Sequence, residues 1–266
     1  MPRREINRVS LNIIEDGDGS ETLVMLHGLL FSHRMFDAQI DVLKDRFRCV
    51  RMDFRGQGDS EVTPAGYDLD TLADDVIALI EDLGDQPVHL LGFSMGGMVA
   101  QRLALKRPEL LRSLVLMNTA AQAEPLRKRP RFALLNMAAR YLGLEKVTPK
   151  IMPLMFSDHF ITAPECQAER DRHLAVVHAN DRIGVTRAVH GVVSRTGVLD
   201  QIQQIKAPTL ILTADQDRAT PAIWSEQMQG QIPGSQLVMI SDSGHMSTAE
   251  QPEAVNQALL SFYDSL

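Results

Sequence analysis

The stretch Leu90-Leu91-Gly92-Phe93-Ser94-Met95-Gly96-Gly97 decides how the rest of this 266-residue chain is interpreted. The apolar run from residue 87 to residue 91 indicates a short buried strand. Residues 98–106 place apolar side chains on one side and basic side chains on the other, which indicates a helix. Between the two lies Gly92-Phe93-Ser94-Met95-Gly96, a match to G-x-S-x-G in the strand–turn–helix context that this motif requires.

The two glycines of the motif have a physical reason. A strand that turns directly into a helix at Ser94 forces that residue into a strained backbone conformation. The turn also crowds positions 92 and 96, where a Cβ atom would clash. The positive end of the helix dipole would then face an oxyanion forming beside the Ser94 hydroxyl. Ser94 is therefore the candidate nucleophile, and the alternative is a serine that caps a tight turn.

Composition excludes several classes of function. The chain carries 34 acidic and 27 basic residues, for a net charge of -7, which argues against nucleic acid or a membrane surface as the main partner. No apolar stretch is long enough to span a bilayer, and the start of the chain is not typical of a signal peptide. The cysteines, Cys49 and Cys166, form no metal-binding pattern. We therefore expect a cytoplasmic protein without a metal or cofactor.

Strand and helix patterns alternate along most of the chain, which predicts a mainly parallel sheet with helices on both faces. Residues 3–14 predict an edge hairpin, and further strands are expected at 22–26, 48–52, 87–91, 114–117, 209–213 and 236–240. Helices are expected at 32–44, 69–83, 221–231 and 252–266. The glycine-rich residues 53–60 resemble a dinucleotide loop, but Glu61 replaces the third glycine, so a structural turn is expected.

The alternation stops between residues 121 and 206, where only helical patterns occur. We predict a core formed by residues 1–120 and 207–266, with residues 121–206 inserted as a helical cap over the strand ends. The apolar residues of this insertion are expected to form mostly its own core and partly a substrate pocket; they are Leu134, Leu135, Met137, Met152, Leu154, Met155, Phe156 and Phe160. The basic run 127–131 is interpreted as a solvated helix start, or alternatively as a site for an anion.

A serine nucleophile needs a base and an acid that orients the base. His245 follows the predicted strand 236–240, where open parallel sheets bind ligands. Two acids, Asp215 and Asp217, follow the strand 209–213. We favour Asp217, because a residue deeper in the loop can reach the neighbouring loop, whereas Asp215 is placed to form a turn. The resulting order along the chain is Ser, Asp, His, which suits the nucleophile-elbow architecture.

These features together resemble the α/β-hydrolase superfamily: the elbow, the acid loop, the late histidine, His27-Gly28 and the loop 53–60. The resemblance implies an α/β fold with a mostly parallel eight-stranded sheet and a helical cap. It also implies an oxyanion hole formed by the backbone N–H groups of Leu29 and Met95. Residues 92–101 look most similar to 3-oxoadipate enol-lactonases and related small carboxylesterases.

Other branches of the superfamily fit less well. Haloalkane dehalogenases and epoxide hydrolases carry Asp at the nucleophile position, where this chain has Ser94. Carbon–carbon hydrolases of the meta-cleavage type usually carry Asn and Trp where this chain has Phe93 and Met246. Cofactor-free haloperoxidases usually have an aromatic residue and proline in place of Leu29-Leu30.

We expect a serine hydrolase that cleaves small carboxylic esters or lactones through an acyl-enzyme. A carbon–carbon hydrolase, or a ligand receptor that retains the triad, remains the alternative. The sequence predicts neither the natural substrate nor the oligomeric state.

Overall fold

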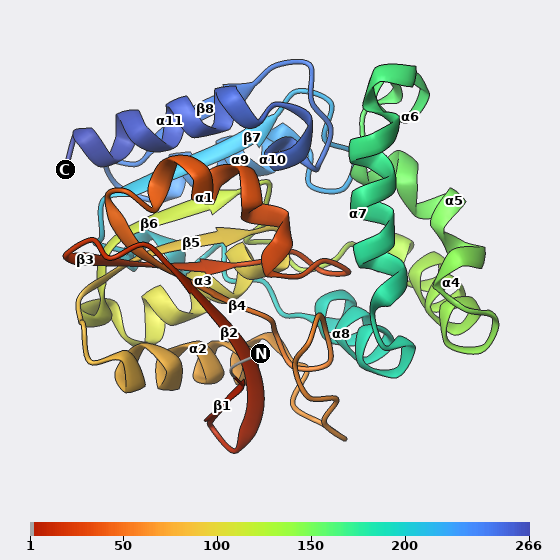
Figure 1. Ribbon diagram of the computed structural model, residues 1–266, viewed down its shortest axis with the longest axis horizontal. Helices are drawn as coiled ribbons and strands as arrows, with labels where there is room; N and C mark the ends of the chain where they lie inside the picture. The colour runs from red at the N-terminus through yellow and green to blue at the C-terminus, as the bar shows by residue number, and fades with distance from the viewer. Residues whose placement is uncertain (1–2) are drawn as a thin grey trace.

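The computed structural model describes residues 3–266, in which eight strands form one sheet in the order β1-β2-β4-β3-β5-β6-β7-β8 (Figure 1). The strands are β1 (Arg3–Ile6), β2 (Val9–Asp16), β3 (Glu21–Leu26), β4 (Phe47–Met52), β5 (Val88–Phe93), β6 (Leu111–Met117), β7 (Thr209–Ala214) and β8 (Gln236–Ile240). The pairs β1–β2 and β2–β4 are antiparallel, and the remaining neighbours are parallel. The predicted fold class is confirmed.

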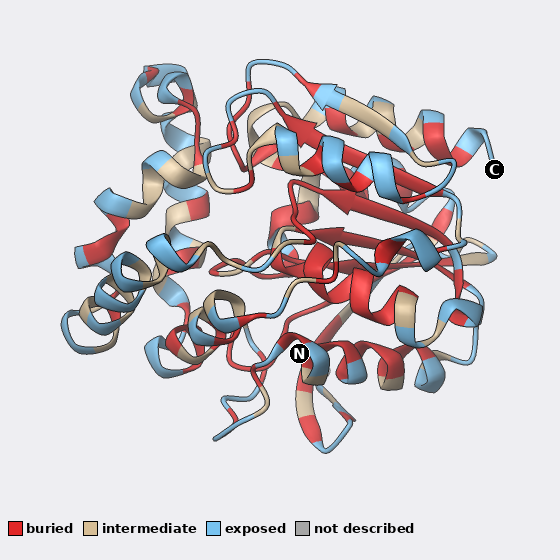
Figure 2. Ribbon diagram, turned by 180° about the vertical axis from the view of Figure 1, so that it is seen from behind, coloured by how far each residue is buried: buried red, intermediate tan, exposed pale blue. Residues whose placement is uncertain are grey.

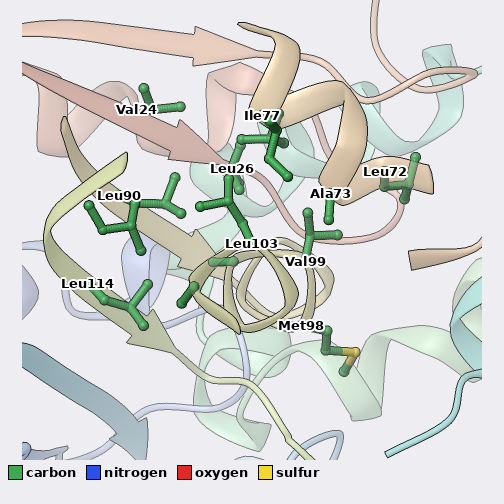
Figure 3. Close-up of a cluster of buried hydrophobic side chains, with 14 of the residues drawn as sticks. Val24, Leu26, Leu72, Ala73, Ile77, Leu90, Met98, Val99, Leu103 and Leu114 are labelled. Carbon is green, nitrogen blue, oxygen red and sulfur yellow. The ribbon is translucent and has the colours of Figure 1, made fainter. Parts of the chain in front are cut away.

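Helices cover both faces of the sheet because successive strand residues point to opposite sides. In β5, Leu90 packs with α2 (Leu69–Leu83), α3 (Met95–Lys106) and α9 (Ala222–Gln231), as the buried cluster in Figure 3 shows in part. Its neighbour Leu91 packs with α1 (Asp37–Leu43) and α11 (Pro252–Asp264) on the other face. Figure 2 shows the result, with buried strands inside and exposed outer helix faces.

The structure shifts one boundary next to the serine. The predicted strand 87–91 continues to Phe93, because Gly92 and Phe93 pair with Leu116 and Met117 of β6. The chain therefore passes from strand to helix at the single residue Ser94.

Helices and no strands occupy the chain between β6 and β7, all within the described residues. They are α4 (Arg129–Leu142), α5 (Leu144–Met155), α6 (Asp158–Thr162), α7 (Gln167–Ala179) and α8 (Arg182–Ser194). Figure 1 places them together beyond one end of the sheet, with α4 and α5 outermost. Within residues 3–266, no helix has the length and apolar character needed to cross a membrane.

One expectation about this segment is wrong. Leu134 and Met137 of α4 are among the residues expected in the core of this segment or in a substrate pocket, but their relative exposures are 63% and 54% and neither lines the active-site cavity. By contrast, Phe156 and Phe160 are buried and their rings stack with centroids 5.0 Å apart. Helix α4 therefore carries more apolar side chains than it buries against the rest of the structure.

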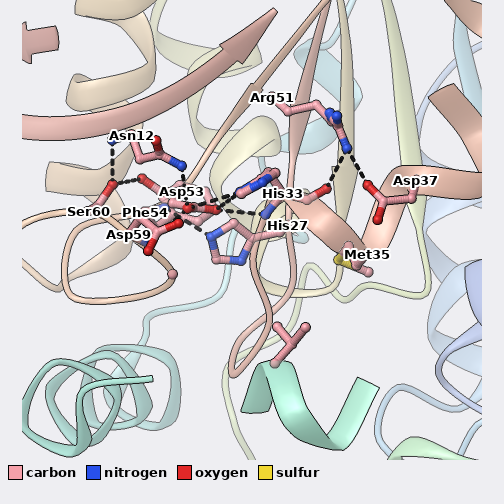
Figure 4. Close-up of polar contacts among 12 residues, drawn as sticks. Asn12, His27, His33, Met35, Asp37, Arg51, Asp53, Phe54, Asp59 and Ser60 are labelled. Carbon is pink, nitrogen blue, oxygen red and sulfur yellow. Dashed lines mark hydrogen bonds and ion pairs between the residues drawn. The ribbon is translucent and has the colours of Figure 1, made fainter. Parts of the chain in front are cut away.

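The glycine-rich loop is held by Asp53, which follows β4 (Figure 4). Its carboxylate accepts hydrogen bonds from the backbone N–H groups of His33 (2.7 Å) and Asp59 (3.0 Å) and from the Asn12 side chain (2.9 Å). Burial alone would raise the pKa of Asp53, but the contact with His33 and the backbone donors lower it to about 2. A Cβ atom at Gly58, where φ is 54°, would overlap this carboxylate. The loop therefore forms a turn around a buried carboxylate.

Replacing Asp53 with Asn is expected to destabilise the fold by about 2 kcal/mol at neutral pH, since a native pKa near 2 compares with an unfolded value near 4. Because the native pKa is the lower one, the stabilisation is present above about pH 4 and is lost as the pH falls towards 2. Guanidinium denaturation of the unaltered protein and of Asp53→Asn, at pH 7 and near pH 3, measures the difference in their free energies of unfolding. A difference that stayed constant or grew on acidification would contradict the assignment.

Candidate active site

Ser94 lies where β5 meets α3, with φ 50° and ψ −113°. This sparsely populated conformation is held from both sides. The Ser94 N–H donates to the Met117 carbonyl (2.8 Å), and the Thr119 hydroxyl donates to the Ser94 carbonyl (2.6 Å). A Cβ atom at Gly92 would lie 2.5 Å from the Gly96 carbonyl oxygen, and one at Gly96 would overlap the Leu26 carbonyl. The predicted crowding at both glycines is present.

The structure brings the three predicted catalytic side chains together from three loops at the carboxyl ends of strands. Nε2 of His245 lies 2.9 Å from Oγ of Ser94, and its Nδ1 lies 2.8 Å from Oδ2 of Asp217. His245 and Asp217 are 2% and 6% exposed, so water competes little for their hydrogen bond. The Phe93 ring packs against the imidazole at a centroid distance of 5.1 Å. The imidazole is thus positioned to accept the serine proton while the carboxylate orients it.

The two candidate acids have different surroundings. Oδ1 of Asp217 accepts the N–H groups of Ala219 and Thr220, both at 2.8 Å. Burial alone would raise the pKa of Asp217, but His245 and these donors outweigh it and keep the pKa below its usual range. Asp215 instead accepts the N–H groups of Asp242 (3.1 Å) and Ser243 (3.2 Å). Asp215 therefore ties down the loop that carries the histidine, whereas Asp217 contacts the imidazole.

The sequence analysis did not identify two polar residues that hold Asp217 in place. Asn118 contacts Asp217 directly, and Ser247 contacts Asn118. The amide nitrogen of Asn118 donates to Oδ2 of Asp217 (3.0 Å), and the Ser247 hydroxyl donates to Oδ1 of Asn118 (2.7 Å). Both residues are fully buried, and Asn118 has a positive φ of 44°. The available signal was that Asn118 directly follows the strand 111–117, at the same sheet edge as Ser94.

We expect Asn118 to act as a positioning residue. Replacing Asn118 with Leu is expected to lower kcat by roughly tenfold to a hundredfold with little change in KM, because a hydrogen bond to a charged group is lost away from the substrate. Steady-state kinetics on a soluble ester measures the two constants. Ser247→Ala is expected to lower kcat by less, because Ser247 acts on Asp217 only through Asn118. A rise in KM at constant kcat would instead indicate a role in binding.

The loop that carries Leu29 is fixed by buried contacts on each side. The N–H of the next residue, Leu30, donates to Oε1 of Gln57 (2.9 Å), and the Asn180 side chain donates to the Leu30 carbonyl (2.8 Å). Before it, Nε2 of His27 accepts the Phe54 N–H (3.0 Å), which leaves its Nδ1 to donate to the Gly28 carbonyl (2.7 Å). Burial lowers the pKa of His27, which favours this neutral form.

Leu29 and Met95, the predicted oxyanion donors, both line the cavity that contains Ser94 and His245. In the part of the chain that the structure describes, neither backbone N–H donates to another protein group. Neither amide therefore has a protein acceptor that a ligand would have to displace.

The cavity has a volume of about 220 Å³ and lies between the carboxyl ends of the strands and the helices α4, α5 and α8. Much of its wall is apolar; these residues include Leu135, Ile151, Leu154, Met155, Val185 and Val189. Charged groups also contribute, including Lys128, Arg131 and the ion pair of Arg195 with Glu124 (3.0 Å). Burial lowers the pKa of the Arg195 guanidinium, and Glu124 partly offsets this. The site can therefore hold a small, mostly apolar molecule against the Ser94 hydroxyl.

The sequence model of the alpha/beta hydrolase fold family matches residues 21–252. This chain therefore belongs to the alpha/beta hydrolase fold family. The family resemblance predicted from the motifs is confirmed.

Known proteins resemble the chain over nearly its whole length. The AB hydrolase superfamily protein YisY of Bacillus subtilis is 31% identical over 95% of both chains. The 3-oxoadipate enol-lactonase 2 of Acinetobacter baylyi is 28% identical over 94% of this chain and 92% of its own. A thermophilic esterase from Thermogutta terrifontis, solved with malate bound, superposes with a TM-score of 0.91 at 28% identity, over 99% and 98% of the chains. Other relatives, 27 to 28% identical, are designated as candidate carbamate hydrolases.

Proposed function

We propose that this protein is a serine hydrolase that cleaves small carboxylic esters or lactones through an acyl-enzyme. The proposal rests first on one observation, the chain of contacts from Ser94 through His245 to Asp217 at 2.9 and 2.8 Å. The esterase and enol-lactonase relatives support carboxylic esters and lactones as substrates, and the relatives designated as candidate carbamate hydrolases make a carbamate the further compound to test.

In the proposed reaction, Oγ of Ser94 attacks the ester carbonyl carbon while Nε2 of His245 takes the hydroxyl proton. The carbonyl oxygen becomes an oxyanion, which accepts hydrogen bonds from the N–H groups of Leu29 and Met95. The carbon–oxygen bond to the leaving group then breaks, and His245 returns its proton to that oxygen. A water molecule, deprotonated by the same imidazole, attacks the acyl carbon. The bond from that carbon to Oγ of Ser94 then breaks, and the imidazolium returns its proton to Oγ, which releases the carboxylic acid and restores the enzyme. Asp217 stabilises the imidazolium in both halves of the cycle.

We also propose that residues 121–206 act as a cap over a core formed by residues 1–120 and 207–266. Helices α4, α5 and α8 contribute cavity residues opposite Ser94, which supports this division. A cavity of about 220 Å³ suits substrates of short to medium length better than long-chain lipids or peptides. Lys128 and Arg131 line the cavity, and this favours lactones that carry a carboxylate as a second group of candidate substrates.

Covalent labelling tests the nucleophile. A fluorophosphonate probe is expected to modify Ser94, because the probe's phosphorus takes the place of the ester carbonyl carbon. Tryptic mass spectrometry should find the adduct on the peptide that contains residue 94, and Ser94→Ala should abolish labelling. A label on another serine would overturn the proposal.

Substrate class is tested by kcat/KM across an acyl-length series of p-nitrophenyl esters, together with lactones, a carbamate and a dienoic diketo acid. We expect the highest values for short to medium acyl esters or lactones, because a cavity of about 220 Å³ encloses shorter chains more completely. A clear preference for the diketo acid would favour the carbon–carbon hydrolase instead. A single turnover followed by a stable covalent product would favour a receptor.

A further inference from the structure

Exposed apolar side chains gather on the outer side of the cap, along α4 and the turn before it. Of the eleven large apolar residues that are exposed in residues 3–266, five fall between positions 126 and 142. They are Leu126 (74%), Leu134 (63%), Met137 (54%), Tyr141 (75%) and Leu142 (67%). Residues 134, 137 and 141 follow the spacing i, i+3, i+7, so they lie on one face of α4. We call this set of three residues the α4 face.

The opposite side of α4 is the one that packs. Phe132, Leu135 and Ala139 line the active-site cavity, and α4 makes its main helix contacts with α8 and α5. The α4 face therefore lies on the side of the helix away from the cavity, with more than half of each side chain exposed. Figure 1 agrees, since α4 lies at the outer edge of the molecule, away from the sheet.

The charge of the same segment is one-sided. Residues 126–142 contain Arg127, Lys128, Arg129, Arg131 and Arg140 and no acidic residue, so all 34 acidic residues of the chain lie elsewhere. Within the described residues, none of these five side chains forms an ion pair with a carboxylate. Arg129 and Arg140 do donate hydrogen bonds to neutral groups, the Glu124 carbonyl and the Thr186 hydroxyl, but no carboxylate neutralises their charge. Positive charge that no carboxylate neutralises, beside exposed apolar residues, is typical of an amphipathic helix that lies on an anionic interface.

We propose that the α4 face docks on the surface of an anionic lipid bilayer, with the helix parallel to the membrane plane. The apolar side chains would enter the headgroup boundary, and exposed basic side chains such as Arg127 would contact the lipid phosphates. The net charge of -7 disfavours a membrane as the main partner of the whole chain, but the outer position of α4 lets this basic segment reach such a surface while the acidic remainder of the chain stays farther away. A second copy of the chain fits less well, because a two-fold contact through α4 would place like charges opposite each other.

The position of α4 connects this surface to the cavity. A groove between α4 and α8 is lined by Met137, Arg140 and Tyr141 on one side and by Arg187 and His190 on the other. It shares four wall residues with the active-site cavity: Phe132, Asn136, Val189 and Val193. Docking through α4 would therefore place the groove, and behind it the cavity, next to the lipid surface.

The test is co-sedimentation of the full-length protein with vesicles of phosphatidylcholine alone or mixed with phosphatidylglycerol. We expect binding to the mixed vesicles only, weakened by added salt, because the attraction is electrostatic. The variant Leu134→Ser/Met137→Ser/Tyr141→Ser should bind at least about tenfold more weakly. Arg127→Glu should weaken binding and make the remaining binding less sensitive to salt, because fewer charges then attract the anionic surface.

Matched controls keep the result specific. Ile223→Ser/Met239→Ser removes exposed apolar groups from α9 and β8, and Arg34→Glu reverses an exposed charge near α1. Both should bind vesicles like the unaltered protein, and circular dichroism should show every variant folded. Equal binding by the triple α4 variant, or no binding by the unaltered protein, would overturn the proposal. A dimer in light scattering that the triple variant loses would assign the α4 face to a second copy instead. Vesicle binding does not depend on turnover, so this test stands apart from the proposed hydrolysis.

Discussion

Replacing Ser94 with Ala is expected to lower kcat on a good ester substrate by on the order of 10⁶, because no other group can form the acyl-enzyme. His245→Ala should cost a similar factor. The imidazole nitrogen lies 2.9 Å from the serine oxygen, and without it the hydroxyl proton has no acceptor. Stopped assays with a high enzyme concentration can measure these residual rates.

The double variant Ser94→Ala/His245→Ala provides the sharper measurement. Two residues that act as one unit are not additive, so the double variant should be little slower than either single one. Thermal unfolding of all three proteins provides the control, since each should retain its fold. If the two losses multiplied instead, Ser94 and His245 would act independently, and the proposed mechanism would be wrong.

The sheet could be predicted from the sequence because its strands are covered on both faces. A run such as Leu114 to Met117 is apolar throughout, and helices with a single apolar stripe separate such runs. The turn at Ser94 was predictable for a related reason. Only glycine fits at positions 92 and 96, because β5, α3 and the end of β3 lie too close together there for a Cβ atom. The two glycines in the sequence therefore indicate this close contact.

The support behind Asp217 could not be predicted in the same way. Asn118 and Ser247 lie 129 residues apart along the chain, and their hydrogen bond depends on how loops from different strands meet. Neither residue belongs to a recognisable local pattern. A buried polar residue at the end of a strand can cap a helix, bridge two loops or form part of a turn, and the sequence does not distinguish these roles.

For the α4 face, the sequence analysis failed to predict which apolar residues are exposed. Helical periodicity identifies an apolar stripe, but it does not reveal whether that stripe is covered. Leu135 and Ala139 turn towards the cavity, whereas Leu134 and Met137 lie on the outside of the same helix. Because α4 carries apolar residues on both sides, the rule that a helix buries one face predicted too large a cap core.

Asp217→Asn is expected to lower kcat by on the order of 10⁴, as the corresponding change does in other triads. The amide can present an N–H to the histidine where the carboxylate presents an acceptor, so the imidazole would take the wrong tautomer. Asp215→Asn is the matched control, two residues away on the same loop. Its remaining carbonyl oxygen can still accept one of the N–H groups of Asp242 and Ser243, and the side chain does not contact the imidazole, so a much smaller loss is expected.

Comparing kcat for the two asparagine variants, with denaturation curves to establish that both are folded, separates the roles of the two acids. A loss at Asp215 that equals or exceeds the loss at Asp217 would show that the functional carboxylate lies two residues earlier. The structure favours the later residue because Asp217 alone of the two lies within hydrogen-bonding distance of Nδ1 of His245, at 2.8 Å. Four further donors, from Asn118, Ala219 and Thr220, keep its carboxylate ionised and pointed at the imidazole.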